Sequence, residues 1–196
     1  MGVANSKNGA FTLEDVINMP PLNLKEVEAL KASWDAIKNK EDIGISTMVR
    51  IFQEHKEIKS KWIFATNLET EAEMISNSQL RYHAKKIMDV LSKVVVKAIN
   101  STNPEDFSVE EFELARLGRN HFHYGVRREH FLLFEEALIY SLKKHTSGKI
   151  TFTPKMERAW HKVFWQVANK IADGIELEEK DNLCLNNMTP PKNDDE

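Results

Sequence analysis

Two of the seven histidines in this chain lie on the apolar faces of expected helices. His83 belongs to a long helical pattern of hydrophobic residues, with Ile87 one turn later. His121 ends a shorter pattern, with Leu117 one turn before it. Three other histidines have polar neighbours and are expected at the surface: His55, His145 and His161. His83 and His121 are therefore the side chains whose placement could support chemistry.

Taken singly, each of these histidines is more simply a core residue with hydrogen-bonded ring nitrogens. As a pair on separate helices they favour a haem site, because haem occupies a flat apolar slot and takes an axial nitrogen ligand from one wall. Imidazole suits iron because it is a nitrogen donor that is neutral at physiological pH. A second imidazole on the opposite wall could hydrogen-bond oxygen at the iron or occupy the sixth coordination position itself.

A transition-metal site made of His83, His121 and His123 is the competing interpretation. Residues two positions apart point to different sides of a helix, so His121 and His123 would not face one metal ion together. Neither a carboxylate nor a cysteine completes a convincing ligand set. The sequence also contains no nucleotide-binding loop and no convincing catalytic triad.

The elements that must position the histidines are helical throughout. Apolar residues recur at helical intervals in six segments, and no segment alternates convincingly with a period of two: 27–37, 45–52, 80–98, 114–121, 131–142 and 156–175. Signals for helix starts and stops separate these segments: Ser76-Asn-Ser78, Ser101-Thr-Asn-Pro104, the Ser108/Glu111 capping box, Gly125, Ser147-Gly148 and Thr153-Pro154. The pattern predicts an all-α fold with six or more helices.

Segments of different composition flank the helical region. Residues 1–23 are expected to form an N-terminal extension, residues 24–177 one globular domain, and residues 178–196 an acidic, disordered tail. The sequence begins Met1-Gly2-Val3-Ala4-Asn5-Ser6, which fits a signal for myristoylation of Gly2. One myristoyl chain gives only weak, reversible attachment to a membrane.

Composition narrows the function classes further. The net charge of −3 offers no basic face for nucleic acid. Cys184 is the only cysteine, so no internal disulfide can form and a reducing compartment is expected. The longest apolar run is too short to span a bilayer. We therefore expect a cytoplasmic protein, with the Gly2 signal permitting a peripheral position at the inner face of the plasma membrane.

In their order and spacing, several motifs resemble the globin family, and in particular the single-domain neuroglobin and globin X types. The resemblance covers residues 24–177 and rests on the segment around Trp34, Trp62-Ile-Phe64, Leu80-Arg-Tyr-His83-Ala-Lys-Lys-Ile87, Leu117-Gly-Arg-Asn-His121-Phe-His-Tyr-Gly-Val126 and the segment 159–168. It implies a three-on-three helical sandwich with extensions at both ends. It also implies haem b, iron protoporphyrin IX, as the cofactor.

The resemblance assigns roles to individual residues. His121 corresponds to the proximal iron ligand, because the family places this histidine five positions before a pocket valine, here Val126. His83 corresponds to the distal histidine. The other implied haem contacts are Phe64 on the haem face, Lys86 near the propionates, Ile87 and Met48 in the distal pocket, and Leu117 and Val126 beside the proximal ring.

Three features depart from the family pattern. No proline opens the third expected helix between His55 and Trp62, the stretch from Phe64 to His83 has no clear match, and the connection from His83 to His121 is longer than in the most similar globins. These departures affect the corner and the distal side of the pocket more than they affect His121.

The expected function is that of a haem protein with bis-histidyl, six-coordinate iron, acting in redox signalling, electron transfer or oxygen sensing with an unidentified redox partner. One alternative is reversible binding of a diatomic gas, namely oxygen, carbon monoxide or nitric oxide, at an open distal site. Another is a haemless globin-fold binding module. Redox side reactions are available to any haem iron, but no residue here requires an enzymatic role.

Overall fold

The computed structural model describes residues 12–17, 19–101 and 111–188, and within these ranges it contains helices and no strand. The elements are α1 (Leu13–Ile17), α2 (Leu24–Ala36), α3 (Lys40–Glu54), α4 (Lys56–Lys59), the short 3-10 helix η1 (Ile63–Ala65), α5 (Glu71–Ser76), α6 (Ser78–Asn100), α7 (Glu111–His123), α8 (His130–Thr146) and α9 (Pro154–Met188). The prediction of an all-α fold is confirmed.

Local capping explains where several helices begin. The side chain of Asn23 accepts a hydrogen bond from the Glu26 backbone N–H, and the Glu26 carboxylate accepts one from the Asn23 N–H. The side-chain oxygen of Asn77 caps α6 by accepting hydrogen bonds from the backbone N–H groups of Gln79 and Leu80. Pro154 is the first residue of α9, as the sequence predicted. The expected Ser108/Glu111 capping box involves a residue outside the described ranges.

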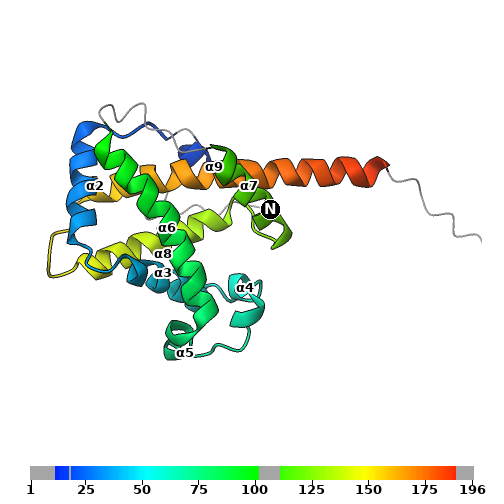
Figure 1. The fold of residues 1–196 in the computed structure, drawn as a ribbon, viewed down its shortest axis with the longest axis horizontal. Coiled ribbons are helices and arrows are strands. Elements are labelled where there is room, and N and C mark those ends of the chain that lie inside the picture. The colour runs from blue at the N-terminus through cyan, green and yellow to red at the C-terminus, as the bar shows by residue number, and fades with distance from the viewer. Residues whose placement is uncertain (1–11, 18, 102–110, 189–196) are drawn as a thin grey trace, which may run out of the picture.

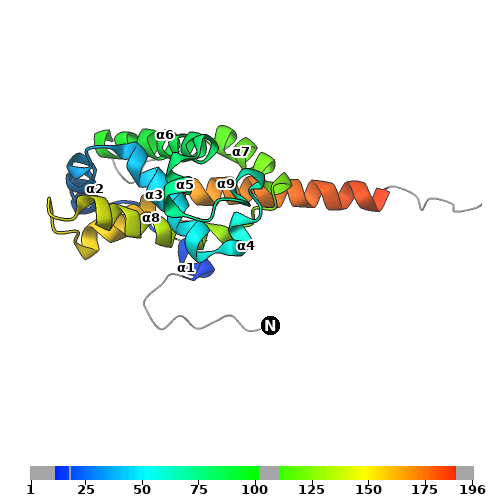
Figure 2. The ribbon, with the colours of Figure 1, turned by 90° about the horizontal axis from the view of Figure 1, so that it is seen from below.

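The long helices form two layers that cross one another. Helix α9 packs against α2, α6, α7 and α8, while α3 packs against α6 and α8 (Figure 1). The view turned by 90° shows α6 and α7 along one side of α9, with α8 on its other side (Figure 2). This arrangement of α2, α6 and α7 over α3, α8 and α9 is the expected three-on-three sandwich.

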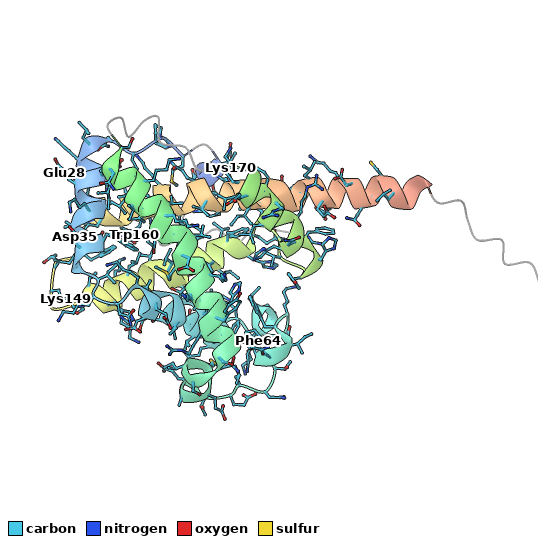
Figure 3. The ribbon with its side chains drawn as sticks, viewed as in Figure 1. Glu28, Asp35, Phe64, Lys149, Trp160 and Lys170 are labelled. Atoms are coloured by element: carbon cyan, nitrogen blue, oxygen red, sulfur yellow. The ribbon has the colours of Figure 1, made fainter. Side chains whose placement is uncertain are left out.

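Two apolar clusters fill the space between the layers. The larger cluster surrounds Trp160, whose indole N–H donates to the Ser33 hydroxyl over 2.9 Å (Figure 3). The smaller cluster lies under the corner formed by α3, α4, η1 and α5, and includes Phe52. Ile87 packs against both clusters. The two clusters therefore meet along α6, the helix that carries His83.

Glycines allow the two histidine-bearing helices to approach their neighbours closely. A Cβ atom on Gly44 of α3 would lie 2.6 Å from the carbonyl oxygen of Ala84, the residue after His83. On α7, a Cβ atom on Gly118 would overlap the Ile171 carbonyl of α9, and one on Gly174 would overlap the Ala115 carbonyl of α7. Because the helix backbones are in contact at these crossings, the position of each histidine relative to the core is fixed.

The acidic segment after residue 177 corrects one expectation. Helix α9 continues to Met188 and extends beyond the body of the molecule, so residues 178–188 are helical rather than disordered (Figure 1). Arg119 of α7 contacts the carboxylates of Glu178 at 2.6 Å and Asp181 at 2.8 Å. Glu178 and Asp181, which had suggested a solvated tail, instead pair with a cation on another helix. Residues 189–196 of the expected tail lie outside the described residues.

The N-terminal extension contributes to the core where the structure describes it. Val16 of α1 and Leu22 are buried against the larger apolar cluster. The backbone carbonyl of Val16 also accepts a hydrogen bond from the Asn169 side chain of α9, over 2.9 Å. Gly2 lies outside the described residues. No helix within the described ranges combines the length and the hydropathy needed to cross a bilayer.

Candidate functional site

The two histidines singled out in the sequence face each other across the gap between α6 and α7. The centres of the His83 and His121 rings are 6.5 Å apart, and the ring planes are inclined by 48°. The pair lies far apart in sequence, so the crossing of the helices creates the site. Both rings are partly buried.

A backbone contact orients the His121 ring. Its Nδ1 lies 2.8 Å from the carbonyl oxygen of Leu117, one turn earlier in α7. A carbonyl can only accept, so Nδ1 donates in this contact and Nε2 is the ring nitrogen left to bind a ligand. Metal-binding histidines commonly donate their other ring N–H to a backbone carbonyl in this way, which fixes the orientation of the ring. Leu117 thus orients the ring through its carbonyl as well as packing on the core.

The end of α7 ties Val126 to the same histidine. Gly125 has φ of +73°, and its N–H donates to the Phe122 carbonyl. The Val126 N–H donates to the His121 carbonyl over 3.2 Å. These two bonds form a Schellman cap, which requires a left-handed residue at the position of Gly125. The five-residue spacing from His121 to Val126 is therefore set by the geometry of a helix end.

Trp62 holds the His83 ring from the side. The centres of the two rings are 4.4 Å apart, and the planes meet nearly edge to face. Burial, followed by the neighbouring charge of His121, lowers the pKa of His83 to about 4. His83 is accordingly a neutral imidazole at physiological pH, and one of its nitrogens has an electron pair available.

Aromatic and aliphatic side chains surround the pair. Phe64 of η1 is half-buried, with its ring centre 5.6 Å from that of Trp62 and 6.5 Å from that of Phe52 (Figure 3). Met48 is buried in the same smaller cluster, and Ile87 lies one turn after His83. The structure thus brings these sequence-predicted residues to the side of the gap that carries His83.

Lys86 has a different environment from the rest of the predicted set. It is exposed, and its ammonium lies 5.3 Å from the centre of the Tyr82 ring on the outer side of α6. Val126 is half-buried and packs against the larger cluster on the His121 side. Gly2, the predicted lipidation site, is outside the described residues.

The competing metal site is not supported by the geometry. The Nε2 atom of His123 lies 3.1 Å from the Glu178 carboxylate and does not join the His83–His121 pair. Across the described ranges, no group of three His, Cys, Asp or Glu side chains is placed to hold a metal ion. His161 was expected at the surface, but it is largely buried with its Nδ1 2.6 Å from the Glu135 carboxylate, so that expectation was wrong.

Two aromatic residues next to the histidines were not identified from the sequence. Trp62 had been noted only as part of a corner motif, and Tyr124 only as part of the segment after His121. The ring of Tyr124 lies 6.5 Å from that of His121 and nearly perpendicular to it, and the side chain is 70% exposed. The position of Tyr124 three residues after His121 was the available signal. The Trp62 contact has no local signal, because it joins distant segments.

Comparison with known proteins agrees with the fold. The family profile described as Globin matches residues 45–171, which is more than half of the chain and includes both histidines. The chain belongs to the globin family. Globins bind haem, and they bind diatomic gases such as oxygen at the haem iron.

Several named globins are similar to this chain. Neuroglobin of Tetraodon nigroviridis is 27% identical over 157 residues, covering 80% of this chain and 94% of the relative. Anaerobic nitrite reductase HBII of Casuarina glauca is 29% identical over 158 residues, covering 80% and 92%. Cytoglobin-2 of Oryzias latipes is 28% identical over 153 residues, covering 75% and 81%.

The side chains of this globin fit a haem group between α6 and α7. The donor set consists of two imidazoles, the ligand type that haem iron takes in globins. His121 presents a nitrogen whose partner nitrogen is already bonded to Leu117, and His83 is neutral. Met48, Phe64 and Ile87 belong to or pack against the neighbouring apolar cluster, and they would supply the apolar lining that a porphyrin requires.

Proposed function

We propose that this globin holds haem b with His121 as the proximal and His83 as the distal ligand of the iron. In this proposal the resting iron is six-coordinate, and the protein acts in one-electron redox signalling or electron transfer, or in oxygen sensing. The redox partner is a second molecule that approaches the haem edge. Haem, when bound, supplies an iron centre that changes its charge by one electron.

The separation of the two imidazoles is the observation that carries the proposal. A metal–imidazole bond is about 2.0 Å long, and a ring nitrogen lies about 1.1 Å from its ring centre. Two imidazoles on opposite sides of one metal ion therefore have ring centres about 6.3 Å apart. The distance between the His83 and His121 ring centres, 6.5 Å, is close to this value. It supports ligation by both rings with little movement of either helix.

The surrounding residues have distinct parts in this proposal. The Leu117 carbonyl holds His121 in one tautomer, and the Val126 cap holds the helix end in place. Trp62 restrains the His83 ring from the side. Phe64, Met48 and Ile87 exclude water from the cofactor. We assign Lys86, on the exposed side of α6, to the haem propionates.

Occupation of the distal position by His83 favours electron transfer over gas storage. If the open form is only a fraction of the population, the apparent affinity for a gas falls by that fraction. An electron can still pass to or from the iron in the closed form. The similarity to neuroglobins and cytoglobins supports a haem globin.

We also propose that Gly2 is myristoylated, which mass spectrometry of the native N-terminus tests directly.

The deciding experiment is the visible absorption spectrum of the purified haem-loaded protein, ferric and then reduced with dithionite. Sharp, split bands in the deoxygenated ferrous state are expected, because two imidazoles give low-spin, six-coordinate iron. A single broad band would mean a vacant distal position and would favour reversible oxygen binding. Absence of a Soret band after added haem would overturn the haem assignment.

A matched variant assigns the sixth ligand. His83→Leu should convert the split bands to the broad five-coordinate form and should raise the rate of carbon monoxide binding. His123→Leu makes the same change at a histidine of α7 that contacts Glu178, and it should leave both properties unchanged. A split spectrum that survives His83→Leu would exclude His83 as the distal ligand.

A further inference from the structure

Charge is distributed unevenly along the long axis of the molecule. The turn between α8 and α9 and the helix ends beside it, residues 141–158, have five cations and a single carboxylate: Lys143, Lys144, Lys149, Lys155, Arg158 and Glu157. Residues 173–181 of α9 have five carboxylates and one lysine. The two segments lie toward opposite ends of the molecule (Figure 1). A chain with a net charge of −3 therefore has a locally basic segment, and we call residues 141–158 the basic end.

Contacts between α8, α9 and the turn hold the basic end together. Lys143 of α8 pairs with Glu157 of α9 at 2.8 Å, so the one carboxylate of the basic end already has a cation beside it. The Lys149 ammonium donates to the backbone carbonyl of His145 over 2.9 Å. The cations of the turn and of both helix ends therefore lie on one compact part of the surface.

Three lysines of the basic end are exposed: Lys144, Lys149 and Lys155. Lys149 lies at the outer edge of the molecule (Figure 3). No carboxylate within the described ranges forms an ion pair with any of the three. Burial lowers the pKa of His145; the charge of Asp42 opposes this shift, and the charges of Lys144 and Lys149 add to it. The two lysines near this ring thus outnumber the neighbouring carboxylate.

An anionic bilayer matches this surface in both shape and charge. Exposed lysines spread over a turn and two helix ends can each meet a lipid headgroup without a shaped pocket. The acylation signal at Gly2 indicates the same partner, because one myristoyl chain binds a membrane weakly and a polybasic patch is one of the second signals that make attachment stable. The carboxylates toward the other end of α9 are repelled by anionic lipid, so the separation of charge also orients the molecule.

We propose that the basic end is the surface through which this globin lies on an anionic membrane, with the extension of α9 directed away from the lipid. The proposal goes beyond the haem site and does not depend on it. It adds an electrostatic attachment to the proposed acyl anchor, and it can be measured in protein that lacks the acyl group.

Vesicle binding of the full-length, haem-loaded, unacylated protein tests the patch. The protein should bind vesicles that contain phosphatidylserine and should not bind vesicles of phosphatidylcholine alone. Binding should be lost between about 0.1 M and about 1 M salt, because the screening length shortens from about 10 Å to about 3 Å. A lysine near an anionic surface strengthens binding about fivefold, so the triple variant Lys144→Gln, Lys149→Gln and Lys155→Gln should bind about a hundredfold more weakly.

A matched triple variant controls for net charge. Lys85→Gln, Lys93→Gln and Lys180→Gln change three exposed lysines outside the basic end, and this variant should bind nearly as the wild type does. Equal losses in the two triple variants, equal binding to both kinds of vesicle, or no binding to phosphatidylserine vesicles would overturn the proposal. Binding to polyglutamate but not to phosphatidylserine vesicles would assign the basic end to an acidic protein instead, and would overturn it too.

Fluorescence quenching tests the orientation. One fluorophore is attached at Lys149→Cys in a Cys184→Ser background, and another is attached to the native Cys184, about 45 Å along α9 from Pro154. Lipids with a spin label in the headgroup should quench the first fluorophore and leave the second unquenched, and the reverse result would overturn the proposal. Failure of the proposed Gly2 acylation is distinguishable, because it appears as an unmodified N-terminus in the mass spectrum and leaves vesicle binding of the unacylated protein unchanged.

Discussion

At the residue scale, His121 and His123 are two positions apart but have opposite environments. The Nδ1 of His121 is bonded to the Leu117 carbonyl and its ring faces His83. His123 is mostly exposed and contacts Glu178. Helical geometry explains the contrast, since residues two apart point to different sides of the axis.

This contrast leads to a first prediction. His121→Ala should lose haem, because it removes the only proximal nitrogen, whereas His123→Ala should retain it. Transfer of haem to an excess of apomyoglobin, followed in the Soret region, measures the difference. Equal haem loss from the two variants would contradict the assignment of His121 as the proximal ligand.

A second prediction concerns the neutral state of His83 in the haem-free protein. Burial lowers the pKa of His83 from 6.5 to about 4 in the folded state, while the unfolded chain keeps the ordinary value. As pH falls below about 6.5, the unfolded state binds a proton that the folded state does not. Stability is therefore lost progressively down to about pH 4 and the loss then levels off.

The haem-free His83→Leu variant is the control for this titration. Urea unfolding of both proteins at about pH 7 and about pH 4.5 gives their difference in unfolding free energy. Acidification should destabilise the wild type more than the variant, since the variant has no imidazole at this position. A difference that does not change with pH would show that His83 titrates normally in the folded protein.

At the scale of elements, backbone contacts at glycines place the two histidine-bearing helices. Gly118 of α7 and Gly174 of α9 each lie against a carbonyl of the other helix. Gly44 of α3 has the same relation to Ala84 of α6. The separation of the His83 and His121 rings depends on these crossings as much as on the histidines themselves.

A third prediction follows for Gly118→Ala. The added methyl group would overlap the Ile171 carbonyl, and overpacking of this kind costs about 1–3 kcal/mol of unfolding free energy. It should also move α7 and speed haem loss. Asn120→Ala, an exposed change on the same helix, should have little effect on either quantity. Chemical unfolding and haem transfer measure both, and an unaffected Gly118→Ala variant would mean that the crossing is not tightly packed.

The sequence predicted the six long helices and the histidine pair because both depend on local patterns, but it did not locate the short helices α1, α4, η1 and α5. Apolar spacing located α6 and α7, and the Gly125 signal located the end of α7. The sequence did not predict the contact between Trp62 and His83, which joins segments from two parts of the chain. It also misjudged residues 178–188, because local composition cannot reveal that Arg119 will lie beside Glu178 and Asp181.

At the scale of the whole molecule, the N-terminal extension is partly built into the core. Val16 and Leu22 are buried against residues of the larger cluster, although they precede the first long helix. The Lys162 ammonium also donates to the Pro21 carbonyl over 3.0 Å. The part of the extension next to α2 therefore stabilises the domain, whatever the segment before it does.

A fourth prediction tests this contribution. Leu22→Ala should lower the free energy of unfolding by about 2–5 kcal/mol, the usual cost of removing a fully buried leucine side chain. Leu24→Ala, two positions later, removes the same side chain from a site that is 67% exposed. It should change stability by about 0.5 kcal/mol or less. Equal effects in urea unfolding would mean that Leu22 is not packed in solution.

The close contact between Gly118 and Gly174 couples α7 to α9 beside His121, the proposed iron ligand. Because neither glycine leaves room for a side chain, we expect a movement of α7 to be transmitted to the part of α9 that extends beyond the body (Figure 1). Cys184, an exposed free thiol, lies about 15 Å along the helix beyond Gly174. The chain thereby carries its own reporter position, and a fluorophore on Cys184 would register events at the pocket from outside it.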